Sequence, residues 1–138
     1  MKIQATPSSL KQKSKEVTKD CTEFCEEFKS FVKGHKCMSL TAAQVGKFIR
    51  VIAVKNKSRK KTFVLVNPSI LSESKKKVIS EERTLDKVNV ATLKKMRPLW
   101  VVIQYQTPDL SKTKKKVFLH RQAAAACHAL DILDGNLR

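Results

Sequence analysis

An amphipathic segment near the N-terminus constrains the fold of this 138-residue chain more than any other feature. Its apolar residues recur at intervals of three and four in the order Cys21, Phe24, Cys25, Phe28, Phe31 and Val32. This spacing places them on one face of a 3.6-residue helix. Asp20 and Glu23 have the spacing of a capping box, and Gly34 suits a helix end. The sequence therefore predicts an amphipathic helix that begins at Asp20, stops at Gly34 and buries its apolar face.

Short runs of β-branched and other apolar residues follow, and they predict strands over residues 48–54, 62–66, 99–105 and 116–119. Lysine-rich stretches, Asn67-Pro68 and Arg97-Pro98 separate these runs. An alanine-rich segment over residues 122–133, followed by Gly135, predicts a second helix. We therefore expect an α+β fold with antiparallel strands, an N-terminal amphipathic helix and a second helix near the C-terminus. The length of the chain suits a single domain of residues 1–138.

Basic residues far outnumber acidic ones, 29 against 12, which gives a formal net charge of +17. This excess goes beyond what solubility requires and indicates a polyanionic partner. One three-lysine run alone is typical of a solvated turn, but four clusters in a small domain favour nucleic acid. We expect them mainly on loops, where they would contact phosphates. The clusters are Lys55, Lys57, Arg59, Lys60 and Lys61; Lys75, Lys76 and Lys77; Lys94, Lys95 and Arg97; and Lys112, Lys114, Lys115 and Lys116.

Other partners and sites fit the sequence less well. No run of about 18 apolar residues is present, residues 1–17 contain no secretory h-region, and the amphipathic segment carries three glutamates. We therefore expect no membrane partner. Cys21 and Cys25 lie four residues apart among apolar residues, which indicates reduced thiols on a buried helix face rather than a zinc site. Aromatic residues make up 6% of the chain and are scattered, which favours phosphate contact over base stacking.

Three further segments carry a family signature. Residues 39–46 read Ser-Leu-Thr-Ala-Ala-Gln-Val-Gly, residues 82–86 read Glu-Arg-Thr-Leu-Asp, and residues 128–135 read His-Ala-Leu-Asp-Ile-Leu-Asp-Gly. In order and spacing they resemble the three motifs of peptide deformylases, metalloenzymes that remove the formyl group from nascent chains. Those motifs are Gly-Leu-Ala-Ala-x-Gln-Val-Gly, Glu-Gly-Cys-Leu-Ser and His-Glu-x-Asp-His-Leu-x-Gly. The resemblance covers nearly the whole chain and implies a peptide deformylase-like fold around the C-terminal motif helix.

The residues that carry the family's chemistry differ in this sequence. The resemblance places Thr84 where the family has a cysteine ligand and Ile132 where it has the second histidine ligand. A threonine hydroxyl does not ionise near neutral pH, and isoleucine has no lone pair to donate. Ala129 stands where the family has its catalytic glutamate, and a methyl group cannot transfer a proton. Only His128 of the three ligands remains, so we expect no metal, no other cofactor and no catalysis.

The retained motif residues are expected to serve the structure. Gln44, which hydrogen-bonds the substrate carbonyl in the family, is expected to tie its own loop to the core. His128 is expected to be a packed or hydrogen-bonded core histidine rather than a lone ligand. Arg83 replaces the glycine of the second motif and adds bulk where the family brings the substrate backbone close. This substitution argues against a working peptide cleft.

Together, the charge and the resemblance predict a non-catalytic deformylase homologue that binds rRNA within a ribosome, beside neighbouring ribosomal proteins. Deformylases act at the ribosome, and mitochondrial ribosomes commonly recruit former enzymes, so we expect the mitochondrial matrix, or otherwise the cytoplasm. No small-molecule substrate is expected. The alternatives are a ribosome assembly factor, an enzyme with an unconventional site, and a module that binds nascent peptides.

Overall fold

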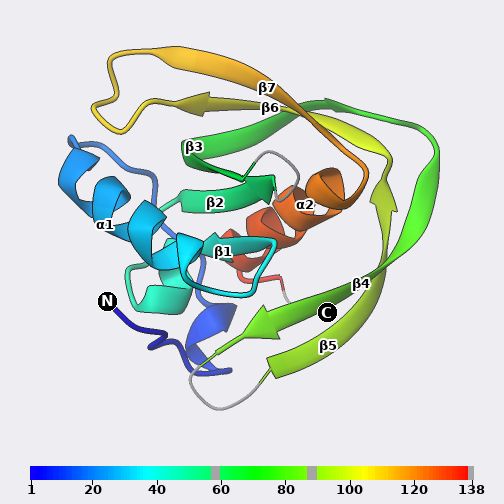
Figure 1. Ribbon diagram of the computed structural model, residues 1–138, viewed down its shortest axis with the longest axis horizontal. Coiled ribbons are helices and arrows are strands. Elements are labelled where there is room, and N and C mark those ends of the chain that lie inside the picture. The colour runs from blue at the N-terminus through cyan, green and yellow to red at the C-terminus, as the bar shows by residue number, and fades with distance from the viewer. Residues whose placement is uncertain (57–59, 87–89, 137–138) are drawn as a thin grey trace.

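The structure is a computed structural model that describes residues 1–56, 60–86 and 90–136. Two α-helices and seven strands form its framework (Figure 1). The helices are α1 (Thr22–Lys33) and α2 (Arg121–Leu133), with short 3-10 helices η1 (Ser9–Lys11) and η2 (Ala42–Val45). The strands are β1 (Ser39–Thr41), β2 (Val51–Asn56), β3 (Lys61–Glu73), β4 (Lys77–Leu85), β5 (Val90–Pro98), β6 (Trp100–Gln106) and β7 (Thr113–Leu119).

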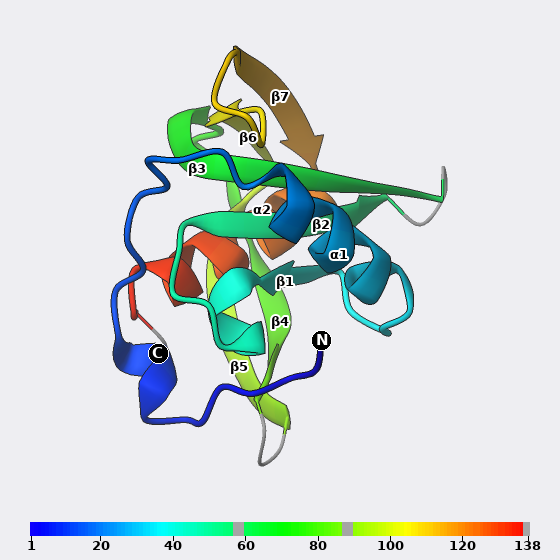
Figure 2. The same cartoon turned by 90° about the vertical axis from the view of Figure 1, so that its left-hand side faces the viewer.

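Five strands form one antiparallel sheet in the order β1-β2-β3-β6-β7, and β4 pairs with β5 in a separate hairpin. The two α-helices pack on opposite faces of the larger sheet (Figure 2). Strand β2 illustrates the layering because its side chains alternate: Val51 and Ala53 join the cluster under α1, whereas Ile52 and Val54 join the cluster under α2. All four side chains are fully buried. A strand buried on both faces explains why its sequence is a continuous apolar run.

The chain bends sharply where β3 passes into β4 and β5 passes into β6. The Ser74 hydroxyl fixes this bend: Oγ donates to Lys76 O at 2.8 Å and accepts from Leu99 N at 2.7 Å. The bend turns the β4–β5 hairpin away from the sheet and alongside α2 (Figure 1). The hairpin and α2 carry the residues of the second and third motifs.

Both predicted helices are confirmed, but the predicted cap of the first is wrong. Helix α1 begins at Thr22, and Asp20 Oδ1 accepts the Thr22 N–H at 2.8 Å. Asp20 lies before the N-cap position, so its side chain closes a local turn and does not form a capping box with Glu23. Gly34 ends the helix as expected, with an ordinary right-handed conformation. The helix buries Cys25, Phe28 and Val32.

The predicted strands are confirmed in part, and the expectation that the lysine clusters lie on loops is wrong for several of them. Strands β1, β4 and β5 were not predicted. Lys94 and Lys95 lie within β5, and residues 114–116 lie within β7. Lysines are tolerated there because these strands expose one face, or because the lysine stem packs on an apolar surface, as Lys116 does with its ammonium 3.8 Å from the centre of the Phe63 ring.

None of the helices within the described residues combines the length and the hydropathy needed to cross a membrane.

Candidate functional site

The second and third motifs meet where β4 lies against α2. Thr84 on β4 and His128 on α2 are 44 positions apart in the sequence, yet Thr84 Oγ1 lies 3.0 Å from His128 Nε2. Both residues are buried, with 5% and 6% of their surface exposed. The two positions that the resemblance assigns to a cysteine and a histidine ligand are therefore direct neighbours. A hydrogen bond joins them.

The other contacts of the His128 ring define what it can do. Nε2 also lies 3.2 Å from the carbonyl oxygen of Arg83. A carbonyl oxygen can only accept a hydrogen bond, so this contact favours a proton on Nε2. Nδ1 lies 3.2 Å from Glu82 Oε1, but the two atoms lack hydrogen-bond geometry. His128 is thus a buried, hydrogen-bonded histidine held between the hairpin and its own helix.

A buried ion network continues from Glu82. Arg97 on β5 donates two hydrogen bonds to the Glu82 carboxylate, at 2.9 and 2.7 Å, and a third to Asp131 Oδ2 at 2.7 Å. Lys95 Nζ also contacts Asp131 Oδ2, at 3.0 Å. Asp131 lies on α2, so the network joins the hairpin to the helix a second time.

The network holds Glu82 and Arg97 in their charged forms. Burial alone would raise the pKa of Glu82, but the neighbouring His128 and the contacts and charge of Arg97 lower that pKa to about 2. Burial alone would lower the pKa of Arg97, but its bonds to Glu82 and Asp131 raise that pKa above its usual range. The Glu82–Arg97 pair therefore remains ionised at neutral pH.

This network corrects one predicted contact. Arg97 was expected on an RNA-binding surface, yet it is 7% exposed and its guanidinium bonds to two carboxylates inside the protein. The sequence pattern missed this role because Arg97 continues a run that contains Lys94 and Lys95. The alternation along β5 separates them, since Arg97 and Lys95 face α2 and Lys94 faces solvent.

The first motif forms a tight turn at the end of β1. Gln44 Oε1 accepts from Thr41 N at 2.9 Å, and Gln44 N donates to Thr41 Oγ1 at 3.3 Å, which forms a capping box. The backbone carbonyl of Gln44 accepts from Gln4 N and Ala5 N, so the turn also binds the N-terminal segment. Gln44 is 2% exposed; its side chain braces its own turn, and its backbone carbonyl holds the N-terminal segment.

The two apolar motif positions lie inside the core. Ile132 is 2% exposed and belongs to a cluster with Ala5, Leu10 and Ala43. Ala43 comes from the first motif, so the first and third motifs are joined here by apolar packing. Ala129 is fully buried in the cluster between α2 and the sheet. Neither side chain offers a donor atom.

Most of the predicted RNA-contact lysines are exposed, and they are spread over the molecule. Figure 1 places the β3–β4 turn and the β6–β7 turn near opposite ends of the long axis. The exposed members are Lys60, Lys61, Lys75, Lys76, Lys77, Lys94, Lys112, Lys114 and Lys115. Lys55 is half-buried and donates to the His35 carbonyl, and Lys116 is half-buried over Phe63. Lys57 and Arg59 lie outside the described residues.

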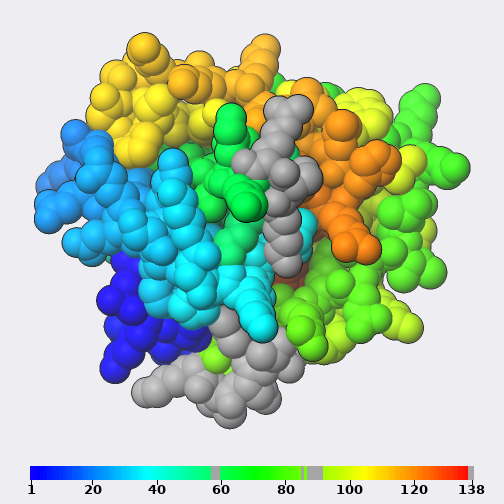
Figure 3. Space-filling view, in the orientation of Figure 1, coloured from blue at the N-terminus to red at the C-terminus, as the bar shows by residue number. Residues whose placement is uncertain are grey.

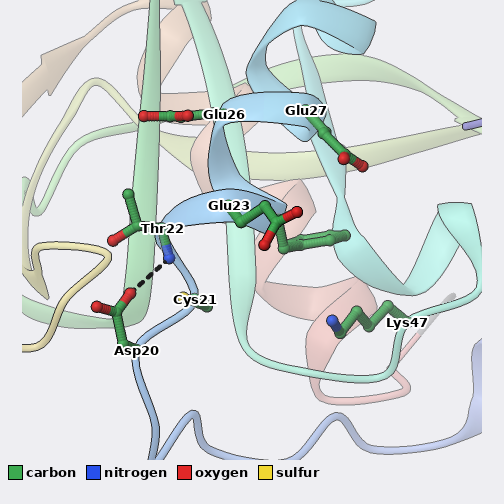
Figure 4. Close-up of a pocket in the computed structure, with 8 residues that line it drawn as sticks. Asp20, Cys21, Thr22, Glu23, Glu26, Glu27 and Lys47 are labelled. Atoms are coloured by element: carbon green, nitrogen blue, oxygen red, sulfur yellow. Dashed lines mark hydrogen bonds between the residues drawn. The ribbon is translucent and has the colours of Figure 1, made fainter.

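A separate acidic hollow lies at the start of α1. It has a volume of about 720 Å³ and is lined by Asp20, Cys21, Thr22, Glu23, Phe24, Glu26, Glu27 and Lys47 (Figure 4). Lys47 Nζ lies 4.6 Å from the centre of the Phe24 ring. In the space-filling view, α1 covers one side of the molecule, away from β4 and the C-terminal end of β7 (Figure 3). The hollow is therefore distinct from the motif residues.

Comparison with solved structures shows which known proteins share this fold. The structure superposes on the crystal structure of peptide deformylase from Thermotoga maritima with a TM-score of 0.80, at 20% identity over 99% of this chain and 92% of that chain. It also resembles a probable peptide deformylase from synechococcus phage S-SSM7, with a TM-score of 0.73 at 29% identity over 97% of this chain and 94% of that chain. The shared architecture is that of a peptide deformylase-like fold.

Sequence comparison extends the relationship from fold to family. The polypeptide deformylase family model matches residues 1–138. A peptide deformylase of Finegoldia magna is 31% identical over 132 residues, which span 93% of this chain and 80% of that protein. The chain belongs to the peptide deformylase family, and the family and fold expected from the motifs are confirmed.

The residues at the motif positions do not fit the metal that this family implies. Metal ligands must offer a lone pair or a negative charge, and the four motif positions here hold one imidazole, a neutral hydroxyl, an alanine and an isoleucine. Glu82, the nearest carboxylate, is bound on both oxygens by Arg97. Across residues 1–56, 60–86 and 90–136, no three His, Cys, Asp or Glu side chains converge as a metal site would require.

Proposed function

We propose that this chain is a non-catalytic peptide deformylase homologue that binds ribosomal RNA as a structural component of a ribosome, with the mitochondrial matrix as its location. The observation that carries the proposal is the contact between Thr84 and His128 beside the buried residues Ala129 and Ile132. Hydrolysis at a metal centre needs a set of ligands and a group that transfers protons. At these positions the chain supplies one imidazole and no such group.

The contact pattern also argues against a metal-free hydrolase. Thr84, His128 and Glu82 have the order of a nucleophile, a base and an orienting carboxylate. A base must have a free lone pair toward the nucleophile, but Nε2 faces the Arg83 carbonyl as well as the Thr84 hydroxyl. Nδ1 lacks hydrogen-bond geometry to Glu82, whose oxygens are bound by Arg97. These contacts support a structural role for the three residues.

The charge distribution supports the RNA partner. The net charge is +17, and the exposed lysines lie on several turns and strands. Lysine ammonium groups bind phosphates as point charges and release condensed counterions, so their affinity depends on salt and little on base sequence. A surface spread over several sides suits a protein wedged among RNA segments better than a single groove. We therefore propose recognition of RNA shape through distributed phosphate contacts.

Density-gradient sedimentation of the tagged protein from lysate, at low and high salt, tests this function. Co-migration with a ribosomal subunit at both salt concentrations is the expected result for a structural component. Release at moderate salt would instead indicate an assembly factor held by phosphate contacts. Migration as a free 15.6 kDa protein at both salts would contradict a ribosomal role.

Metal analysis of the same purified protein tests the catalytic half separately. Less than about a tenth of an equivalent of any transition metal is expected after purification without chelator, because one imidazole cannot hold a metal tightly. An equimolar transition metal, together with release of formate from a formyl-peptide, would show an enzyme with an unconventional site.

A further inference from the structure

The outer edge of the five-stranded sheet is a feature that neither the family nor the proposed function explains. Strand β7 ends the sheet order, and it pairs with β6 along one edge. No strand within the described residues pairs with its other edge. Figures 1 and 2 both show β7 at the outer border of the molecule. An unpaired edge presents a row of N–H and C=O groups to any extended chain.

The register determines which residues present these groups. Thr107 N donates to Lys112 O at one end of the β6–β7 ladder, and His120 N donates to Leu99 O at the other. Hydrogen-bonded pairs alternate along an antiparallel ladder, so the even-numbered residues of β7 bond to β6. The odd-numbered residues therefore direct their backbone groups outward, and they are Thr113, Lys115, Val117 and Leu119.

The side chains of this edge divide it into an apolar half and a basic half. Val117 and Leu119 are 55% and 52% exposed, and Leu119 lies opposite Trp100, which is 38% exposed on β6. Toward the other end of the strand, Lys114 and Lys115 are both exposed. Lysines alone protect an edge strand against pairing with copies of itself. Protection does not account for two half-exposed aliphatic residues beside an exposed tryptophan.

We propose that the β7 edge binds an extended acidic segment of a partner protein by antiparallel strand addition. Every strand pair in this sheet is antiparallel, and antiparallel pairing is slightly the more stable per residue. Main-chain hydrogen bonds to residues 115, 117 and 119 supply affinity, while the side chains of β7 select the sequence. The proposal assigns Lys114 and Lys115 to this partner rather than to RNA, and it does not depend on RNA binding by the other lysine clusters.

The side chains of β7 define the sequence pattern of the partner. In an antiparallel pair, the N-terminal residue of the partner segment lies opposite Leu119. Its following residues then lie opposite Val117, Lys115 and Lys114 in turn. Directly opposed residues share a face of the sheet, so apolar residues are expected opposite Leu119 and Val117. Acidic residues are expected opposite Lys115 and Lys114, because opposite charges stabilise a cross-strand pair. Read from N to C, the pattern is apolar-x-apolar-x-acidic-acidic.

A peptide titration of the 15N-labelled protein tests this proposal. The probe is acetyl-Val-Thr-Val-Thr-Glu-Glu-amide, and its matched control is the same sequence reversed. Shifts of the amide signals of Val117 and Leu119 are expected, with affinity about tenfold higher for the probe than for the reversed peptide. N-methylation of the third residue, which faces Val117, should weaken binding about tenfold, whereas N-methylation of the fourth, whose amide points away, should leave it unchanged.

The Val117→Pro variant provides a second test with the lysine charge intact. Its N–H faces outward, so proline removes a donor for the partner and no bond to β6. We expect the proline variant to lose peptide binding and Val117→Thr to retain it. If the proline variant does not fold, the peptide titrations of the unmodified chain still test the proposal. Equal affinity for the probe, the reversed peptide and the two N-methylated peptides would show that charge alone holds them and would overturn the proposal. An RNA oligonucleotide that displaces the peptide and binds Val117→Pro undiminished would assign the edge to phosphate contacts and also overturn it.

Discussion

Replacement of Glu82 by glutamine tests the buried ion network directly. Glu82 is 6% exposed, and its pKa falls from 4.5 to about 2 in the folded protein. At about 1.4 kcal/mol per pKa unit, this depression corresponds to about 3 kcal/mol of stability at neutral pH. Because the folded pKa is lowered, that stability is present above the unfolded pKa of 4.5 and is lost as the pH falls toward 2. Glu82→Gln should therefore be about 3 kcal/mol less stable at pH 7 and only about 1 kcal/mol less stable at pH 3.

Urea unfolding from pH 3 to pH 7, followed by far-UV circular dichroism, measures this difference. All other titrating groups are common to both proteins, so their contributions cancel in the difference between the two free energies of unfolding. Glu81→Gln is the matched control, because Glu81 neighbours Glu82 on β4 but is exposed, and its effect should stay within about 0.5 kcal/mol. A Glu82→Gln effect that is the same at pH 3 and pH 7 would refute a charged Glu82–Arg97 pair as its source.

Three further outcomes follow from the site and the surface. Thr84→Val should destabilise the fold by about 1 to 2 kcal/mol in thermal unfolding, because it leaves buried His128 with one partner fewer, whereas Thr84→Ser should not. Combining Thr84→Cys, Ala129→Glu and Ile132→His should let the protein retain an equivalent of zinc in metal analysis, and no single substitution should do so. Reversing the charge of the lysines at 75–77 should weaken RNA binding, measured by fluorescence anisotropy, and reduce the slope of log affinity against log salt by about two, with similar losses for the clusters away from β7.

The helices follow from the sequence because local pattern determines them, whereas the contact between the second and third motifs does not. A helix that packs by one stripe shows that stripe in its spacing, as α1 does with Cys25, Phe28 and Val32. Thr84 and His128 could be paired from the sequence only through the order of the family motifs, since nothing local links β4 to α2. Motif order thus supplied the long-range contact that hydrophobic periodicity cannot.

The β4–β5 hairpin escaped prediction because its partner is not another apolar sheet. Its inward residues include Glu82, Thr84 and Arg97, which satisfy one another and α2 through polar bonds. Its outward residues include Lys94 and the exposed Ile79, which is 73% exposed. Neither strand of the hairpin therefore shows, along its sequence, the alternation of apolar and polar residues that indicates a half-buried strand.

The same hairpin shows how this fold can hold together at the motif positions without a metal. In a metal site, ligands from a strand and a helix are joined through the ion they share. Here Thr84 bonds His128 directly, and Arg97 joins Glu82 of the hairpin to Asp131 of the helix. The link is completed by apolar packing of Ile132 against the first motif. These contacts need only the chain itself. Treatment with a chelator should therefore leave the unfolding transition unchanged, in contrast to a fold whose stability includes metal binding.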